Sequence, residues 1–310
     1  MSTFDIVTFG EPLMELARYD RNGETLYLPG FGGDTSNVAV AAARQGARVA
    51  VFTALGDDAF GRDFLALWER ETIDASHVSI RRETRTGLYL IGYGEEGHFF
   101  TYYRAGSAAS LVAPQDVPLD LIASARVLHV SGISQAISTS ACDAVFTAIR
   151  HARENGVAVS YDSNLRLNLW PLERARAVIH AAMAQADIAR PGLDDARQLT
   201  GLTTPEDICD FYLTLGCKIV ALTLGKDGTM IALPGDRRII PARIVNAVDA
   251  TGAGDTFGGA FLAEWLRTQD PFAAAAYANA AAALSTQGQG AVAPMPHRTA
   301  VETFISAQAT

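Results

Sequence analysis

Short, continuous apolar runs alternate with longer stretches of helical spacing, and this alternation restricts the fold more than any other feature of the sequence. Strands buried on both faces have such continuous runs, and helices between parallel strands cover the two faces of the sheet. We therefore expect an α/β fold with a mostly parallel central sheet covered by helices on both faces. The expected strands are residues 6–10, 48–54, 127–130, 157–161, 188–190, 219–224, 229–233 and 237–240, and the expected helices are 38–46, 60–70, 141–154, 172–184, 193–199, 208–215 and two that begin at 257 and 272.

Two regions of the sequence do not fit the central sheet. They are polar, and their apolar and polar residues alternate with a period of two. They lie near residues 12–30 and 86–104. The second contains a hairpin signal, with glycine at both ends of the turn 94–97. We expect both regions to leave the main sheet and to meet over one end of it as a small β-strand lid.

The composition limits where in the cell the protein is expected and which kinds of molecule it is expected to bind. The chain has 310 residues and a net charge of −9, which argues against a nucleic-acid partner, because a phosphate backbone binds a basic face. Three cysteines without CxxC spacing suit a reducing cytoplasm. No run reaches the roughly 18 apolar residues of a membrane span, and no signal segment is visible. We expect one cytoplasmic domain over residues 1–310 that binds no membrane.

The stretch Asp249–Asp255 carries the clearest chemical signal. Gly252, Ala253 and Gly254 precede Asp255 at the start of a predicted helix. A glycine-rich turn that opens a helix presents free N–H groups and the positive end of the helix dipole to an anion. An acid there would repel an anion, so Asp255 is interpreted as a base for a hydroxyl that attacks phosphorus. An ordinary helix start with a first-turn charge explains this stretch alone equally well.

Other polar groups follow predicted strands, where ligands bind to open parallel sheets. Tyrosine offers a ligand an apolar aromatic ring that carries a hydroxyl. Arginine offers two parallel N–H donors that can bind both oxygens of a carboxylate. Each group read alone is also explained by a turn, a helix cap or a solvated edge. Asn279, in the alanine-rich helix, could contact a base or face solvent. The groups are residues 32–37, 102–107, 162–166 and 223–228.

The sequence lacks the motifs of several other site classes. It has no GxxxxGKS or GxxxxGKT loop, and no GxGxxG follows the first strand, which argues against a dinucleotide-dependent dehydrogenase. The six histidines show no zinc-binding spacing. His129 lies in an apolar strand and is expected to be a satisfied core residue.

Taken together, these residues resemble the PfkB (ribokinase-like) family of carbohydrate kinases over essentially the whole chain. The carboxyl-terminal signature of that family is similar to residues 249–261, and the amino-terminal signature to residues 32–39. Within the family the chain is most similar to 2-keto-3-deoxygluconate kinases, through residues 10–13, 102–110 and 162–166. The resemblance implies a ribokinase-like fold with a lid, and often a homodimer or higher homo-oligomer formed through it.

The resemblance also implies a reaction: ATP-dependent phosphorylation of the primary hydroxyl of a sugar acid, assisted by Mg²⁺. Asp255 would be the base, and Gly252, Ala253 and Gly254 would hold the transferring phosphoryl group. The residues implied for the sugar acid are Gly33, Asp34, Asn37, Tyr89, Tyr102, Arg104, Ile133 and Arg166, and those implied around ATP are Asn164, Thr223, Gly225, Gly228 and Asn279.

Some positions depart from the family pattern. Gly192 and Asp195 stand where the family often has Asn-x-x-Glu, so Mg²⁺ would be held through water and phosphates, with Asp195 as the candidate side chain, or through different residues. Glu15 stands where many neutral-sugar members carry Asp. A monovalent cation such as K⁺ is a further implication near Asp249 and Thr251.

Three alternatives stay open at this stage. Arg104 and Arg166 favour a substrate with a carboxylate, yet a kinase for a neutral ketose such as fructose or tagatose shares the other features. A protein that binds sugar and nucleotide without turnover is a second alternative, which an ADP-release assay distinguishes. A dehydrogenase is the third, and nicotinamide binding would be its test.

Overall fold

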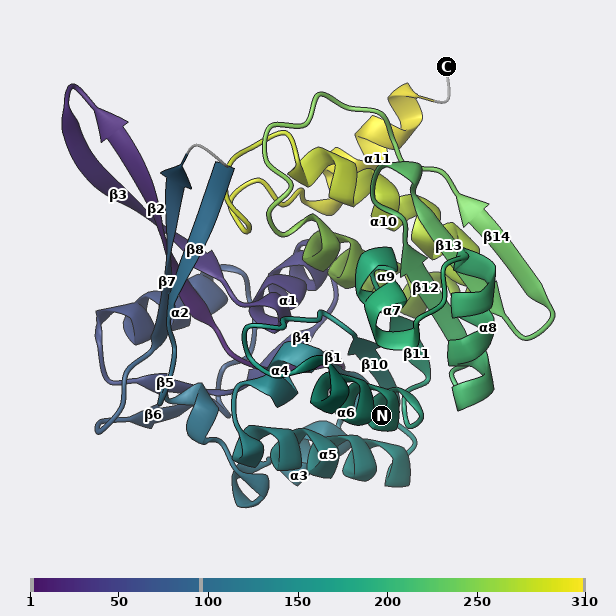
Figure 1. Cartoon of the computed structure of the whole chain (residues 1–310), viewed down its shortest axis with the longest axis horizontal. Helices are drawn as coiled ribbons and strands as arrows, with labels where there is room; N and C mark the ends of the chain where they lie inside the picture. Colours follow the sequence, from purple (N-terminus) through teal and green to yellow (C-terminus); the bar gives the residue numbers. More distant parts are fainter. Residues whose placement is uncertain (1–2, 95–96, 309–310) are drawn as a thin grey trace.

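The computed structural model describes residues 3–94 and 97–308, and an eight-stranded sheet runs through its centre (Figure 1). The strand order is β14-β13-β12-β11-β10-β9-β1-β4. The six strands from β12 to β4 are parallel, and β13 and β14 add an antiparallel edge. The strands are β1 (Phe4–Phe9), β4 (Val49–Phe52), β9 (Ala125–Ser131), β10 (Ala158–Asp162), β11 (Ile188–Arg190), β12 (Ile219–Thr223), β13 (Thr229–Leu233) and β14 (Asp236–Ile240).

Helices cover both faces of this sheet, as the sequence predicts. Successive side chains of a strand point to opposite faces, so Ile6 packs in one apolar cluster and Val7 in the other. The Val7 cluster includes residues of α3 (Leu119–Ala123), α5 (Thr139–Glu154), α6 (Leu172–Met183), α7 (Leu193–Thr200) and α8 (Pro205–Leu215). The Ile6 cluster includes residues of α1 (Asp34–Arg44), α2 (Ala59–Arg70), α9 (Ala253–Thr268), α10 (Pro271–Ser285) and α11 (Arg298–Ala307).

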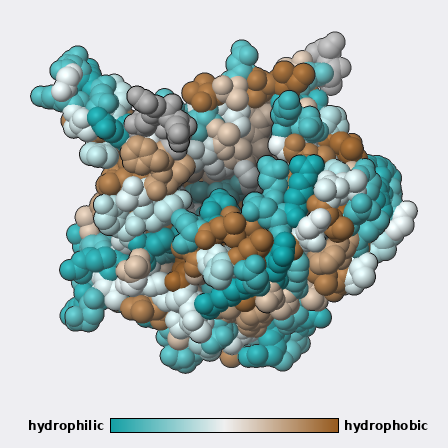
Figure 2. Space-filling model, viewed as in Figure 1, coloured by the Kyte–Doolittle hydropathy of each residue, from teal (hydrophilic) through white to brown (hydrophobic). Residues whose placement is uncertain are grey.

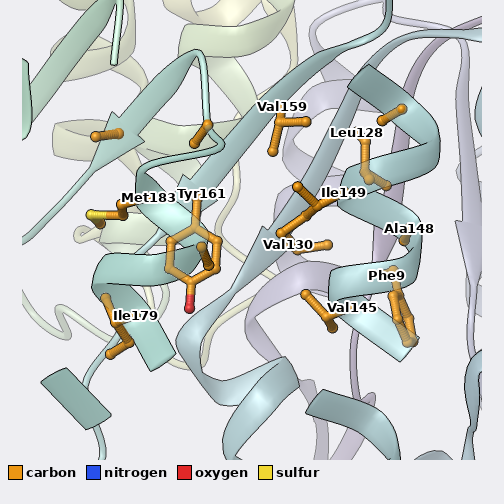
Figure 3. Packing of buried hydrophobic residues seen from close by; sticks show 14 of the residues in the cluster. Phe9, Leu128, Val130, Val145, Ala148, Ile149, Val159, Tyr161, Ile179 and Met183 are labelled. Atoms are coloured by element: carbon orange, nitrogen blue, oxygen red, sulfur yellow. The ribbon is translucent and has the colours of Figure 1, made fainter. Parts of the chain in front are cut away.

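The core on the α5 side is densely filled by branched and aromatic side chains (Figure 3). Leu128 of β9 and Tyr161 of β10 are fully buried, as is Ile149 of α5. Burial of each such side chain stabilises the fold by about 1.5–3 kcal/mol. This face therefore anchors the strands whose carboxyl ends carry polar residues.

A second, four-stranded sheet stands apart from the main sheet at the upper left of Figure 1. Its order is β3-β2-β7-β8, and it lies where the sequence predicts the lid. The turn residues 95 and 96 of the predicted hairpin lie outside the described residues. The strands are β2 (Leu13–Arg21), β3 (Glu24–Gly32), β7 (Gly87–Gly94) and β8 (Gly97–Tyr103).

Several short elements were not predicted from the sequence. They are α11, which packs through the buried Val301, the helix α4 (Gly132–Ala136), and a two-stranded sheet of β5 (Ala54–Gly56) and β6 (Ser79–Arg81). Three short 3-10 turns cover Ala109–Leu111, Pro114–Asp116 and Gly225–Asp227. Apart from α11, which has 10 residues, these elements span three to five residues and show too few repeats of a hydrophobic period to be recognised. Within residues 3–94 and 97–308, no helix is long and apolar enough to cross a membrane.

The helices α1 and α9 pack unusually close together, and this contact brings two helix starts to the same place. A Cβ atom at Gly259 would lie 2.5 Å from the Cβ of Ala41 and from the carbonyl oxygen of Val38. The alanine-rich α1 and the glycines of α9 thus permit backbone contact. Both helices begin at the carboxyl-terminal edge of the sheet.

Candidate active site

A cavity of about 800 Å³ lies at the carboxyl ends of the parallel strands, between the main sheet and the lid. Figure 2 shows it as a hollow beside the lid strands, with hydrophilic residues inside. Its lining combines the starts of α1 and α9, the loops after β10 and β11, and the lid residues Tyr89, Phe99, Phe100 and Tyr102. This is the edge at which open parallel sheets bind ligands.

Two glycines allow the backbone to turn into the helices at this edge. Gly33 precedes α1 with φ 92°, and a Cβ there would lie 2.3 Å from the carbonyl oxygen of Glu11. Gly252 precedes α9 with φ 73° and packs against the backbone of Ala291. A side chain is strained at positive φ, so glycine is required at both turns.

The start of α9 presents free N–H groups to the cavity, although not the set expected from the sequence. The N–H of Ala253 donates to the carbonyl oxygen of Ala250 at 3.1 Å, so it is already used within the turn. Among the described residues, the N–H groups of Gly254 and Asp255 have no protein acceptor. The N–H of Ala253 is thus occupied within the turn, and those of Gly254 and Asp255 remain free within the part of the chain that the structure describes.

Asp255 lies in the first turn of α9 and lines the cavity. The amide of Asn37 donates to Asp255 Oδ2 at 2.8 Å, a bond that joins the starts of α1 and α9. Burial and the nearby Asp34 raise the pKa of Asp255 to about 7, while the bond from Asn37 opposes this rise. A base with a pKa near the working pH suits proton transfer.

Asp34, Asp162 and Asp255 lie close together in the lining of the cavity, together with Arg190. Asn164 donates to Asp34 Oδ2 at 2.9 Å, and Arg190 lies 3.3 Å from Asp162 Oδ2. Burial raises the pKa of Asp162 to about 6, although Arg190 lowers it. Asp162 belongs to the polar group 162–166 that the sequence placed at the strand ends, whereas Arg190 was not selected from the sequence as a site residue. A charged residue at the end of the apolar run 188–190 was the signal that could have identified Arg190.

Arg104 and Arg166 both line the cavity, but their charges are placed differently. Arg104 Nε donates to Glu11 Oε2 at 2.7 Å, and Ser107 donates to the other carboxylate oxygen. Glu11 is 1% exposed, so this ion pair is buried. Arg166 is exposed, and in the described part of the chain it forms no ion pair. Its charge is offset in part by the nearby Asp195 carboxylate, whose pKa burial raises and Arg166 lowers.

Aromatic side chains of the lid form the upper wall. Tyr89 and Tyr102 have ring centroids 5.7 Å apart, and Phe100 lies beside both. The hydroxyl of Tyr89 donates to Glu15 Oε2. Glu15 is 4% exposed and is not part of the lining, so it supports Tyr89 from behind.

Most residues selected from the sequence line this single cavity. They are Gly33, Asp34, Asn37, Tyr89, Tyr102, Arg104, Ile133, Asn164, Arg166, Asp195, Thr223, Gly252, Gly254 and Asp255. Five others, Ala253, Gly225, Gly228, Asn279 and Asp249, are not among its lining residues.

Asn279 is used differently from the sequence-based expectation. Its amide oxygen accepts from Thr229, and its nitrogen donates to the carbonyl oxygens of Ile240 and Pro241. Because all of these bonds are internal, the side chain fastens the β13–β14 hairpin to α10. His129 is a satisfied core residue, as expected: it is 1% exposed and its ring bonds to Ser160.

The residues present fit a loosely held Mg²⁺ better than a protein-built metal cage. Within the described residues, no group of three or more potential metal-ligating side chains surrounds one point. Asp195 lines the cavity, and one of its oxygens accepts from the N–H of Leu165 at 2.8 Å. Asp249 accepts from the N–H and the hydroxyl of Thr251 and from the N–H of Gly290.

The fold and the site define a kinase of the ribokinase-like class: a carboxylate and free N–H groups meet at the strand ends beneath a lid. The model of the pfkB family carbohydrate kinases matches residues 3–298. The chain belongs to this family, and it is therefore a carbohydrate kinase. The fold and family predicted from the sequence are confirmed.

Relatives and a solved structure resemble the chain over nearly its whole length. It is 34% identical to 2-dehydro-3-deoxygluconokinase of Bacillus subtilis, over 99% of this chain and 97% of the relative. It is 32% identical to probable fructokinase-2 of Arabidopsis thaliana, over 98% and 96%. A putative ribokinase II from E. coli, solved with ATP and Mg²⁺, has a TM-score of 0.90 at 26% identity and covers 98% of this chain and 99% of its own.

The buried pair of Glu11 and Arg104 generates a first prediction. Replacing one partner, in Glu11→Gln or Arg104→Met, should destabilise the fold by about 3–5 kcal/mol, because the remaining charge stays buried. The double variant should lose less than the sum of the two single losses. Urea unfolding measures these free energies.

The exposed pair Asp5–Arg48 is the matched control, and the same changes there should cost about 0–1 kcal/mol. Strictly additive effects of the Glu11 and Arg104 changes would contradict a coupled pair.

Proposed function

We propose that residues 1–310 act as one ATP-dependent kinase domain that phosphorylates the primary hydroxyl of a sugar acid, converting 2-keto-3-deoxygluconate to its 6-phosphate. One observation carries the proposal. Arg166, the Asp255 carboxylate and the free N–H groups at the start of α9 all open into the same cavity. A hydroxyl beside this carboxylate would face a phosphoryl group on those N–H groups.

The choice of a sugar acid rests on Arg166. An exposed guanidinium that forms no ion pair within the described residues favours a carboxylate on the ligand, because its paired N–H donors match the two oxygens of that group. The relative from Bacillus subtilis bears the name of a kinase for such an acid. A neutral ketose such as fructose is the second candidate, favoured by the fructokinase relative and by the neutralisation of Arg104 by Glu11.

In the proposed reaction, the Asp255 carboxylate orients the hydroxyl and accepts its proton as the oxygen attacks the phosphorus in line. The N–H groups of Gly254 and Asp255 stabilise the charge that develops on the phosphoryl oxygens. When bound, Mg²⁺ would neutralise phosphate charge, with Asp195 reaching it through water. The lid aromatics exclude water, which suppresses hydrolysis of ATP.

The rest of the nucleotide site is proposed from position alone. ATP would extend from the start of α9 past Thr223 toward the turn with Gly225 and Gly228. Dependence on K⁺ near Asp249 and a cytoplasmic location remain predictions from the sequence.

The role of Asp255 leads to the second prediction. Asp255→Asn should lower kcat by roughly 10²–10⁴, the usual contribution of a general base, and leave sugar binding nearly unchanged. In the unaltered enzyme, kcat/KM should fall as the pH drops through about 7, because a protonated Asp255 cannot accept the proton. An ADP-release assay across pH measures both. A variant rate near normal would exclude the base role.

The third prediction separates the two substrate classes. Arg166→Ala should raise KM for 2-keto-3-deoxygluconate by about 10- to 100-fold, as expected for loss of one charged hydrogen bond worth about 1.5–3 kcal/mol. KM for fructose should change little. Arg150→Ala, on the exposed face of α5, is the control for loss of one positive charge. Equal changes for both sugars would count against the acid.

We also propose that two chains pair through their lids. Large apolar side chains remain exposed on both edge strands of the lid sheet. Leu26, Tyr27 and Leu28 lie on β3, and Phe99, Phe100 and Tyr103 on β8, each 43–60% exposed. Unpaired edge strands with apolar side chains are ready to add further strands or a partner sheet.

The fourth prediction tests this pairing. Leu26 and Leu28 share one face of β3, so the double change Leu26→Asp/Leu28→Asp should convert a dimer into a monomer of 33.0 kDa. Light scattering coupled to size-exclusion chromatography measures the mass. Leu119→Asp on α3, where Leu119 is as exposed as Leu26, is the control. A monomeric unaltered protein would exclude the proposal.

A further inference from the structure

Arg190 occupies an unusual place for an arginine, at the end of a central strand and almost out of contact with solvent. It closes β11, pairs in register with Asp162 of β10, and its side chain is 2% exposed. Ile188, two residues earlier, packs in the cluster that contains α9. Because side chains alternate along a strand, Arg190 points to the same face, directly beneath the start of α9.

The guanidinium of Arg190 contacts α9 at two points. Nη2 donates to the carbonyl oxygen of Gly254 at 2.9 Å. A Cβ atom at Gly258 would lie only 2.1–2.3 Å from the guanidinium atoms. The helix α9 can therefore pass over Arg190 only because residue 258 is a glycine. Within the described residues, Nε and Nη1 have no hydrogen-bond partner.

A buried cation with unfilled donors is costly unless negative charge surrounds it. Asp162 of β10 and Asp255 of α9 provide that charge, and Asp34 of α1 lies close to both of these carboxylates. Asp34 and Asp162 both oppose the ionisation of Asp255, and Asp34 also opposes that of Asp162. Arg190 therefore has two physical effects here. It holds the backbone of the first turn of α9, and its positive charge offsets the repulsion among the neighbouring carboxylates.

We propose that Arg190 is a positioning residue for phosphoryl transfer, which holds the first turn of α9 in place and keeps the Asp255 carboxylate charged among its acidic neighbours. The inference rests on the proposed role of Asp255 as the base. It adds a residue that acts through Asp255 and through the N–H groups of α9, without requiring contact with the sugar.

The groups that face Asp255 support this assignment. Asn37 donates a hydrogen bond to it, Asp34 and Asp162 oppose its charge, and Arg190 is the cation that favours it. Without Arg190, burial and the two acids would raise the pKa of Asp255, and only the neutral hydrogen bond from Asn37 would lower it. The carboxyl group would then gain a proton at a higher pH and would no longer be a base at neutral pH.

The direct test is an NMR titration of ¹³C-labelled aspartate carboxyl groups, with the Asp255 signal identified by its loss in Asp255→Asn. Arg190→Met should raise the titration midpoint of Asp255 by about one pH unit or more, the usual effect of an opposite charge at close range. Arg190→Lys should restore most of the original midpoint, because it keeps the charge. Arg150→Met, which removes an exposed charge, should leave it unchanged.

Gly258→Ala provides a second variant that keeps every charge. Its Cβ would displace the guanidinium, so the midpoint of Asp255 should rise although Arg190 is present. This variant and Arg190→Lys keep the test valid if Arg190→Met does not fold.

Kinetics give an independent readout. At pH 7, kcat/KM of Arg190→Met should fall about 10-fold and should recover by pH 9, while KM for the sugar stays within about twofold. Recovery at high pH is not expected from a merely structural residue. An unchanged midpoint of Asp255 in folded Arg190 variants, or a loss that persists at pH 9, would overturn the proposal. If no sugar or sugar acid is phosphorylated, the proposed function fails, and the titration still decides the role of Arg190.

Discussion

The removal of Asp255 from water among other acids is the constraint on which the site depends. A carboxyl group on the surface is a weak base at neutral pH, because it ionises near pH 4. Burial and the neighbouring Asp34 bring its pKa to about 7, and Asn37 and Arg190 stop a further rise. The pKa of Asp255 is thus set by side chains of α1, β10, β11 and α9 together, since Asp162 of β10 also raises it, and no single residue sets it.

This balance requires that the starts of two helices meet, and the packing of the fold provides the meeting. Gly259 and the alanines of α1 let the two helices approach closely, while Gly33 and Gly252 let the chain enter each helix at a positive φ. The apolar clusters on both faces hold the strands in register, so that β10 and β11 present Asp162 and Arg190 side by side. Core packing and catalytic geometry are therefore linked.

The two arginines that line the cavity, Arg104 and Arg166, differ in how far their charges are neutralised within the protein. Arg104 has the buried partner Glu11, so its cost of burial is offset within the protein, and it stiffens the junction between β1 and the end of β8. Arg166 has no such partner among the described residues and stays exposed to the cavity. Two arginines that look alike in the sequence thus differ in their surroundings, because Arg104 has a buried ion-pair partner and Arg166 is exposed.

The sequence alone determined the α/β alternation, the lid regions and the motif around Asp255, because local periodicity and turn chemistry encode them. It also indicated the family, since two long motifs occur in order. It could not show that the N–H of Ala253 is used by Ala250, that Asn279 fastens a hairpin, or that Arg190 lies beneath α9. Those facts depend on contacts between residues far apart in the chain, and only the tertiary structure brings such residues together.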